Sequence, residues 1–249
     1  MHVVGMIPAR FASSRLPGKA LRLIGDKPMI QRVYERCIQS RTLDLVCVAT
    51  DDERIARAVE QIGGRAIMTS PYHASGTDRL AEAVQSIPAD IVVNIQGDQP
   101  FLDPQMIDEA VAPLLEEPAL GMATLMHRIT RREDLHDPAV VKVVVDRAGH
   151  ALYFSRALIP YPHREVEHAV YEHIGLYVYR REFLLKIARL TSTTLEQVES
   201  LEQLRVLEHG HPIRVVETRC LENEFSGFSV DTEEDLHRAE AMLKEKGLS

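Results

Sequence analysis

Val3-Val4-Gly5-Met6-Ile7-Pro8-Ala9-Arg10-Phe11-Ala12-Ser13-Ser14-Arg15-Leu16-Pro17-Gly18-Lys19 is the stretch that decides the fold expected for this chain. Its first five residues form an apolar run that is long enough for a buried parallel strand and too short for a membrane span. After the loop, apolar residues between Ile30 and Ile38 recur at helical spacing. The loop therefore leaves the carboxyl end of a first strand, where open α/β sheets bind ligands.

The loop carries three cations, Arg10, Arg15 and Lys19, together with Gly18, which allows close approach of the backbone. Three like charges on one loop repel one another unless an anion lies among them. A triphosphate would suit them, because arginine binds as a fork, lysine as a point charge, and backbone N–H groups fill the gaps. The alternative is a solvated basic turn. The loop is neither a G-x-x-x-x-G-K-[ST] phosphate loop nor the G-x-G-x-x-G of dinucleotide binders.

The first half of the chain alternates between apolar runs and helical periodicity. This alternation predicts a parallel sheet with right-handed crossovers. The expected strands are 45–50, 65–68 and 91–95, and the expected helices are 30–38, 55–62 and 79–87, with a polar loop at 70–78.

The second half is less regular. A helix at 104–115 and a strand at 122–126 are followed by two strand-like runs, 140–146 and 151–155, around Gly149, which predict a hairpin. Further expected elements are a strand at 174–179, helices at 183–190 and 201–207, a strand at 213–217 and a helix at 232–246 that Thr232 caps and Lys246 closes. The expected fold is α/β: a doubly wound, mostly parallel, Rossmann-like sheet with a β-rich insertion at about 140–180, in a single domain over 1–249.

Composition excludes several classes of protein. The 249 residues are 45% hydrophobic and 27% charged, as in a globular protein, and the formal net charge of −8 argues against a nucleic-acid partner. The three cysteines, Cys37, Cys47 and Cys220, are isolated and odd in number, and two of them lie in apolar patterns, which indicates buried thiols in a reducing compartment. We expect no zinc site, no signal peptide and no membrane span.

Two carboxylates follow apolar runs and are candidates for a shared site. Asp98 comes after the run 91–95, and Asp231 precedes the last expected helix. Hard oxygen ligands beside a triphosphate indicate Mg²⁺, which usually takes one or two carboxylates plus phosphate oxygens and water. Taken singly, Asp98 could be a turn residue and Asp231 an acid near a helix cap. The run Ser75-Gly76-Thr77 could likewise be only a helix cap.

Sequence blocks along the whole chain resemble those of the 3-deoxy-manno-octulosonate (Kdo) cytidylyltransferase family. The first is Ile7-Pro8-Ala9-Arg10 with Arg15-Leu16-Pro17-Gly18-Lys19. Eight others follow in order: Ala49-Thr50-Asp51, Ser75-Gly76-Thr77-Asp78-Arg79-Leu80-Ala81-Glu82, Asn94-Ile95-Gln96-Gly97-Asp98-Gln99-Pro100, Val141-Lys142-Val143-Val144, Ala151-Leu152-Tyr153-Phe154-Ser155-Arg156, His173-Ile174-Gly175-Leu176-Tyr177, Leu201-Glu202-Gln203-Leu204-Arg205 and Val230-Asp231-Thr232. The family usually has glycine where this chain has Ser229, and 162–172 matches no block.

The resemblance implies a nucleotidyltransferase that joins CTP to Kdo, releases pyrophosphate and makes CMP-Kdo for lipopolysaccharide in the bacterial cytoplasm. It also implies a homodimer, in which the insertion at about 140–180 contributes to sugar binding and to the interface. By resemblance, the catalytic set is Arg10, Lys19, Asp98 and Asp231, with Asp98 and Asp231 as the Mg²⁺ ligands. The nucleotide set is Pro8, Ala9, Arg10, Arg15, Lys19, Ser75, Gly76, Thr77 and Asp98. The sugar-acid set is Arg79, Gln96, Arg156, His173, Tyr177, Glu202, Gln203 and Asp231.

Three alternatives remain at this point. One is a related CTP:sugar-acid enzyme that acts on 8-amino-Kdo or a sialic acid. The second is a glycosyltransferase, although such enzymes often carry Asp-x-Asp where this chain has Gly97-Asp98-Gln99. The third is a nucleotide-binding subunit without catalytic activity.

Overall fold

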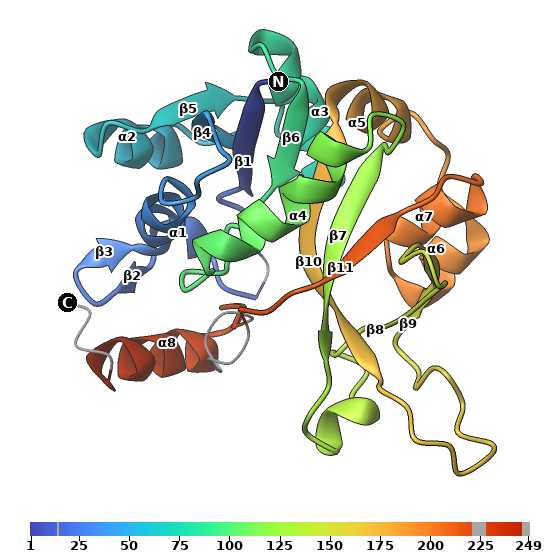
Figure 1. The fold of residues 1–249 in the computed structure, drawn as a ribbon. Coiled ribbons are helices and arrows are strands. Elements are labelled where there is room, and N and C mark those ends of the chain that lie inside the picture. Colours follow the sequence, from blue (N-terminus) through green and yellow to red (C-terminus); the bar gives the residue numbers. More distant parts are fainter. Residues whose placement is uncertain (14, 221–227, 246–249) are drawn as a thin grey trace. The chain divides into compact units, whose positions relative to one another are not determined.

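The computed structural model describes residues 1–13, 15–220 and 228–245. Ser14 of the cationic loop, Ser226 and Gly227 before Phe228, and Lys246 at the end of the last expected helix lie outside the described residues. The chain folds into two compact units, Met1–Asp108 with Cys220–Ser249 and Glu109–Arg219 (Figure 1). The single domain over 1–249, with its insertion, stays a prediction.

The first unit contains a four-stranded parallel sheet in the order β6 (Ile91–Asn94), β1 (Val3–Ala9), β4 (Leu45–Thr50), β5 (Arg65–Met68). These strands confirm the prediction that the apolar runs of this unit form strands. The central strand β1 is buried along nearly its whole length, which is why its sequence is apolar throughout. The helices that connect the strands are α1 (Met29–Cys37), α2 (Glu53–Gln61) and α3 (Gly76–Ala83).

Two local predictions in this unit were wrong. Helix α3 begins at Gly76 instead of residue 79, because the side chain of Ser75 accepts a hydrogen bond from the backbone N–H of Asp78 and caps the helix. A short 3-10 helix, η2 (Val84–Ser86), replaces the end of the expected helix. The sequence reading also missed the 3-10 helix η1 (Lys19–Leu21) and the hairpin of β2 (Leu23–Ile24) and β3 (Lys27–Pro28).

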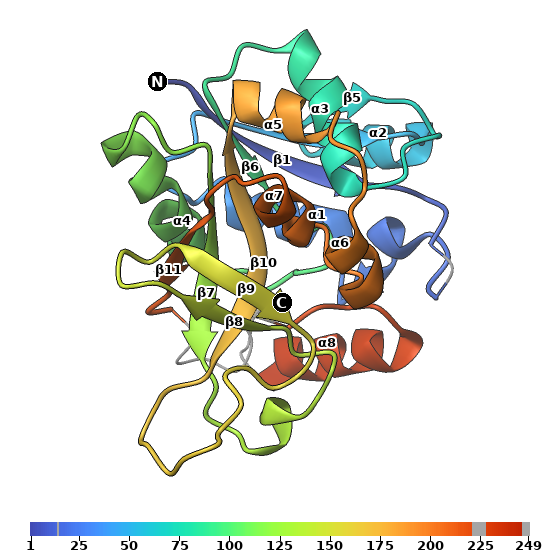
Figure 2. The ribbon, with the colours of Figure 1, turned by 90° about the vertical axis from the view of Figure 1, so that its right-hand side faces the viewer.

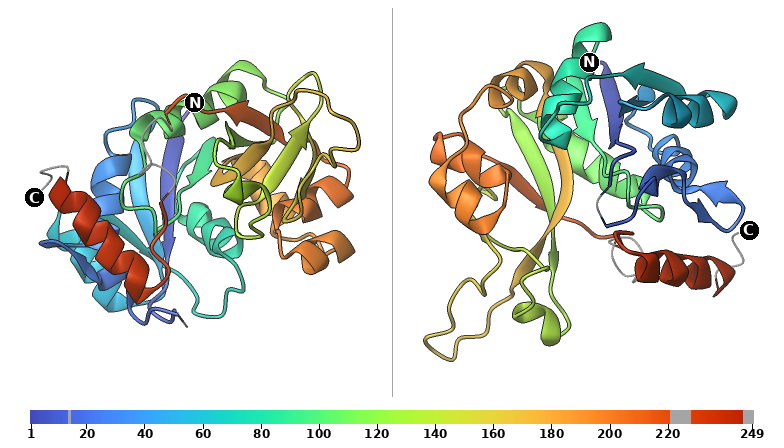
Figure 3. Two further views of the ribbon diagram at one scale, coloured as in Figure 1. Left: turned by 90° about the horizontal axis from the view of Figure 1, so that it is seen from below. Right: turned by 180° about the vertical axis from the view of Figure 1, so that it is seen from behind.

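The last helix, α8 (Glu233–Glu245), packs on the segment that follows β1. As predicted, Thr232 caps it: its hydroxyl accepts from the backbone N–H of Asp235 at 3.2 Å, and Asp235 accepts from the backbone N–H of Thr232 at 3.0 Å. Leu16, which is only 2% exposed, joins a core cluster that contains residues of β2, of α1, and of α8 and its entry: Ile24, Met29, Val230, Leu236, Ala239 and Leu243. Figure 3 shows α8 in red beside the blue N-terminal segments.

In the second unit, β7 (Met122–Arg128) pairs antiparallel with β10 (Tyr171–Arg180) and parallel with β11 (Arg214–Glu217). The chain enters this unit through α4 (Pro104–Glu116). The predicted hairpin is confirmed, since β8 (Lys142–Val145) and β9 (Ala151–Ser155) pair antiparallel and Gly149 has the φ of +81° that the turn requires (Figure 2).

The helices of the second unit are η3 (Glu133–Leu135), α5 (Arg181–Ile187), α6 (Thr194–Glu199) and α7 (Gln203–Glu208). The helix expected at 201–207 was predicted to begin too early. Ser200, with φ 53°, ends α6, and α7 begins only at Gln203. Gly210, with φ +76°, follows α7 as expected.

Gly97 allows the segment after β6 to approach the end of β1. A Cβ at this position would lie 3.0 Å from the carbonyl oxygen of Pro8 and 3.4 Å from Cγ2 of Ile7. We expect Gly97→Ala to lower the free energy of unfolding by about 1–3 kcal/mol, because backbone atoms must move. The measurement is denaturant unfolding. Gly175→Ala is the control, since nothing lies within 4 Å of a Cβ there; an equal loss in both variants would contradict the argument.

Candidate active site

A cavity of about 310 Å³ opens in the first unit at the carboxyl ends of β1 and β6. Eleven of the predicted site residues line it: Pro8, Ala9, Arg10, Arg15, Lys19, Ser75, Gly76, Arg79, Gln96, Asp98 and Asp231. Thr77 is buried in the first turn of α3 and is not among the lining residues. The sequence reading missed Ser13, Ala20, Met29, His73, Ala74 and Gly97.

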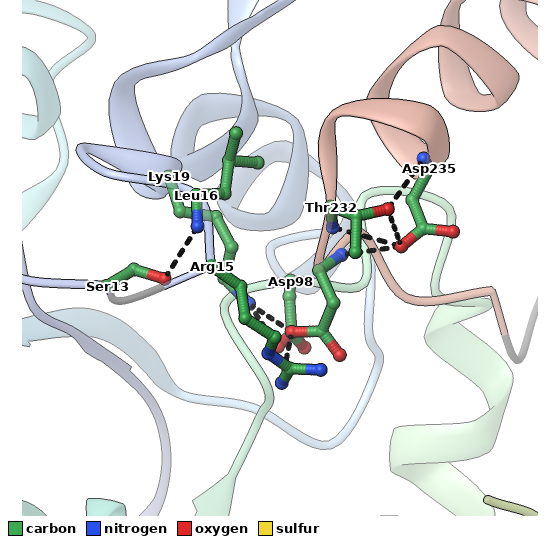
Figure 4. Close-up of polar contacts among 8 residues, drawn as sticks. Ser13, Arg15, Leu16, Lys19, Asp98, Thr232 and Asp235 are labelled. Atoms are coloured by element: carbon green, nitrogen blue, oxygen red, sulfur yellow. Dashed lines mark hydrogen bonds and ion pairs between the residues drawn. The ribbon is translucent and has the colours of Figure 1, made fainter.

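One ammonium group connects the two predicted carboxylates. Nζ of Lys19 lies 2.8 Å from Oδ2 of Asp98 and 3.0 Å from Oδ1 of Asp231 (Figure 4). The guanidinium of Arg15 lies 3.0 Å from the same oxygen of Asp231. These contacts bring together groups that are 79 and 212 residues apart in the sequence. The site is half-buried, with the Lys19 side chain 18% exposed, so these charges interact more strongly than charges in open solvent.

The backbone presents Asp231 to this site. The N–H of Val230 donates to the carbonyl oxygen of Asp98 at 2.9 Å, which joins the two carboxylate-bearing segments directly. The N–H of Asp231 donates to Oδ2 of Asp235 at 3.1 Å, at the start of α8. Asp231 therefore lies beside Lys19, two residues after Ser229.

The donor set suits Mg²⁺. Among residues 1–13, 15–220 and 228–245, no group of three or more His, Cys, Asp or Glu side chains is close enough to hold a metal ion. Two carboxylates on one side of a cation-lined cavity are enough for Mg²⁺, because this ion takes its remaining ligands from phosphate oxygens and water. Asp98 and Asp231 are the residues that would hold it.

Arg79 is committed to protein contacts inside the cavity wall. It is 4% exposed, and its guanidinium donates to Oγ1 of Thr69 at 2.6 Å and to Oδ2 of Asp51 at 2.9 Å. Arg79 thus ties α3 to the ends of β4 and β5. This arrangement gives Arg79 a structural role, and its predicted contact with a sugar acid stays a prediction.

His73 is the clearest residue that the sequence reading missed. Its Nε2 contacts Oε2 of Glu82, which also accepts from the backbone N–H of Ser70 at 3.0 Å. The hydrogen bond from His73 lowers the pKa of Glu82, so the carboxylate is charged. The pair fixes the loop before α3 against that helix. The signal was available, since His73 lies two residues before the Ser75-Gly76-Thr77 block.

In the second unit, the structure brings together His173, Tyr177 and Gln203. The rings of His173 and Tyr177 are 5.3 Å apart, whereas four residues of regular strand would separate them by about 13 Å. A β-bulge between Ile174 and Tyr177 in β10 explains the difference. The hydroxyl of Tyr177 donates to Oε1 of Gln203 at 3.2 Å.

Hydrogen bonding and burial keep His173 neutral. Oγ1 of Thr124 lies 2.9 Å from Nε2 of His173 and donates to the carbonyl oxygens of Ile174 and Leu176. With the hydroxyl proton committed to a carbonyl, Nε2 of His173 is the donor and Nδ1 is the acceptor, 3.5 Å from Nε2 of Gln203. Burial lowers the pKa of His173 to about 3.

The other two members of the predicted sugar-acid set differ in their surroundings. Glu202 occupies the N-cap position of α7, and its charge adds to the effect of burial in raising the pKa of Tyr177. Arg156 donates to the carbonyl oxygens of Glu199 and Pro138, both at 2.8 Å, so its guanidinium braces β9 against α6. Its predicted role in sugar binding stays a prediction.

Comparisons with known proteins agree with this fold and cavity. A family model described as cytidylyltransferase matches residues 4–215. The fold and the cation-lined cavity at the strand ends therefore define a member of the cytidylyltransferase class.

Two relatives are 3-deoxy-manno-octulosonate cytidylyltransferases. The one from Syntrophotalea carbinolica is 52% identical and covers 98% of this chain and 99% of the relative. The one from Geobacter sulfurreducens is 51% identical, and the match covers 98% of this chain and 100% of the relative. A solved CMP:2-keto-3-deoxy-manno-octonic acid synthetase complexed with CTP has a TM-score of 0.93 at 44% identity, covering 99% of this chain and 100% of that chain. The chain belongs to the 3-deoxy-manno-octulosonate cytidylyltransferase family. Among its described residues, no helix is both long and apolar enough to cross a membrane.

The buried His173 predicts a pH dependence of stability. Its pKa is about 3 in the folded chain against 6.5 for an ordinary histidine, so its contribution is fully present above pH 6.5 and is lost as pH falls toward 3. At pH 5 the unfolded state gains about 2 kcal/mol from protonation. We expect His173→Gln to flatten the fall in Tm between pH 7 and 5. The exposed His163→Gln is the control, and parallel curves for all three proteins would contradict this expectation.

Proposed function

We propose that this chain joins CTP and Kdo to give CMP-Kdo and pyrophosphate, with Mg²⁺ held at Asp98 and Asp231. The observation that carries the proposal is the cation-lined cavity in which Lys19 lies between two carboxylates at the strand ends. The relatives and the CTP complex described above support both substrates. They do not favour 8-amino-Kdo, a sialic acid, a glycosyltransferase or a subunit without activity.

The chain's own residues supply binding, orientation and charge. Arg10, Arg15 and Lys19 surround the triphosphate and neutralise the charge that develops on departing pyrophosphate. The anomeric hydroxyl of Kdo attacks the α-phosphorus, and pyrophosphate leaves in line, so positioning and electrostatics account for most of the rate. Mg²⁺ held by Asp98 and Asp231 would supply further charge stabilisation at the phosphate oxygens and would lower the pKa of the attacking hydroxyl.

The nucleotide and sugar sets differ in chemistry as the substrates do. Ser75 caps α3 and Gly76 begins it, both at the wall of the cavity, and the N-terminus of a helix favours negative charge. His173, Tyr177, Glu202 and Gln203 supply neutral donors and acceptors with one carboxylate, which suits the hydroxyl groups of a sugar.

Three further assignments belong to the proposal. The product is used for lipopolysaccharide, the enzyme works in the bacterial cytoplasm, and it forms a homodimer. The dimer is supported by apolar side chains exposed in and after the hairpin, such as Leu152 at 62% and Tyr161 at 79%.

Pyrophosphate release tests the proposed function. The purified chain is assayed with Mg²⁺ and CTP, ATP, GTP or UTP, each with Kdo, 8-amino-Kdo or N-acetylneuraminate. We expect release only with CTP and a much higher kcat/KM for Kdo than for the other acids. Faster turnover with another acid would correct the substrate, and no release with any pair would contradict the assignment as an enzyme.

The two carboxylates should act as one unit toward the metal. Residues that share one function are non-additive under mutation. We therefore expect Asp98→Asn and Asp231→Asn each to remove most Mg²⁺-dependent turnover, and the double variant to be little worse than either. Melting curves of the two single variants should stay close to wild type, because each single variant leaves Lys19 one carboxylate partner.

Asp26→Asn is the matched control, since Asp26 is an exposed carboxylate paired with Arg32 outside the cavity. It should keep full turnover. Losses that multiply in the double variant would mean that Asp98 and Asp231 have separate functions.

A further inference from the structure

Phe11 is the residue around which the cationic loop closes. Its carbonyl oxygen accepts from the backbone N–H of Ser13 at 2.9 Å and of Gly18 at 3.1 Å. Its ring lies against Gly18, where a Cβ would be 3.1 Å from Cε2 of the ring. Gly18 also has φ +67°, so a larger residue would meet both backbone strain and the ring.

Arg54 lies over the same ring. Its Cζ atom is 3.4 Å from the ring centroid, which is the distance of a stacked guanidinium. The fork of Arg54 donates to both oxygens of Asp52, Nε to Oδ1 at 2.9 Å and Nη2 to Oδ2 at 2.7 Å. These bonds keep the guanidinium plane in one orientation.

Asp52 connects this stack to the rigid part of the unit. Its side chain caps α2 by accepting from the backbone N–H of Arg54, and its own N–H donates to Oγ1 of Thr50 at the end of β4. Asp52, Arg54 and Phe11 thus form a continuous connection from the sheet to the loop.

We propose that Phe11 and Arg54 are positioning residues that hold the cationic loop in the conformation that receives the triphosphate. The loop carries three cations, and the ion pairs of Arg15 and Lys19 with Asp98 and Asp231 offset only two of the three charges, so repulsion still favours opening of the loop before an anion arrives. Leu16 holds one side of the loop in the core, and the Phe11–Arg54 contact holds the other. The inference rests on the proposed function, because it assigns the triphosphate of CTP to this loop.

The expected effect follows from the fraction of free molecules in which the loop has the conformation that binds the triphosphate. Without the contact, fewer free molecules have the loop in its competent form, and the apparent Kd rises in inverse proportion to that fraction. Once CTP is bound, the triphosphate holds the loop, so kcat is unchanged. An exposed cation–π contact corresponds to about a two- to fivefold change in an equilibrium constant.

The experiment measures CTP binding by calorimetry without Kdo, then KM for CTP and kcat, for Arg54→Ala, Phe11→Leu and the double variant. We expect Kd and KM for CTP to rise about two- to fivefold for Arg54→Ala, with kcat and Tm unchanged. The double variant should be no weaker than Phe11→Leu alone, because the two residues share one contact. Phe11→Tyr keeps the ring face and should bind CTP like wild type.

Arg57→Ala is the matched control. Arg57 is on the same helix and is ion-paired with the exposed Glu53 at 2.9 Å. Its substitution by alanine removes the same charge as Arg54→Ala. A rise in Kd for Arg57→Ala equal to that for Arg54→Ala, or multiplied losses in the double variant, would overturn the proposal. A fall in Tm that accounts for the lost binding would also overturn it. Failure of the proposed function is distinct, since wild type itself would then release no pyrophosphate.

Discussion

The rest of the site depends on the ion pairs that the ammonium group of Lys19 makes with Asp98 and Asp231. Asp98 and Asp231 carry like charges and would repel each other if no cation lay between them. Lys19 contacts both, and Arg15 adds a second contact to Asp231. The loop after β1, the segment after β6 and the entry to α8 are therefore joined by charge. An incoming triphosphate adds negative charge, which is why we propose a divalent cation beside the lysine.

The cationic loop has an apolar and a polar side, and both are needed. Leu16 packs in the core with α8, and Phe11 packs on Gly18 beneath Arg54, while Arg10, Arg15 and Lys19 line the cavity. The apolar contacts offset part of the repulsion among the like charges of the loop. The geometry of the site thus depends on side chains that do not line the cavity.

Much of the fold was predictable, because β1 and β4 are largely apolar, mostly buried runs between turn residues. Helix α6 was missed because its sequence is polar, although the capping box of Thr193 and Glu196 was a usable signal. The pairing of Asp98 with Asp231 was anticipated, but the lysine between them was not, since spacing along the chain cannot show which cation turns inward. Arg79 was predicted to contact the sugar acid, and this stays a prediction; its buried contacts with Thr69 and Asp51 depend on the tertiary structure and could not be read from periodicity.

The place of α8 in the chain has a consequence for synthesis. Translation proceeds from the N-terminus, and domains fold as their segments emerge. Lys19 and Asp98 are made long before Asp231, and Leu16 reaches Val230 and Leu236 only after the whole second unit has been translated. A nascent chain therefore has the lysine with one carboxylate and a half-built core beneath its loop. The cluster of Lys19, Asp98 and Asp231 is completed only by a segment that is made after the second unit, so chains that stop before this segment lack Asp231.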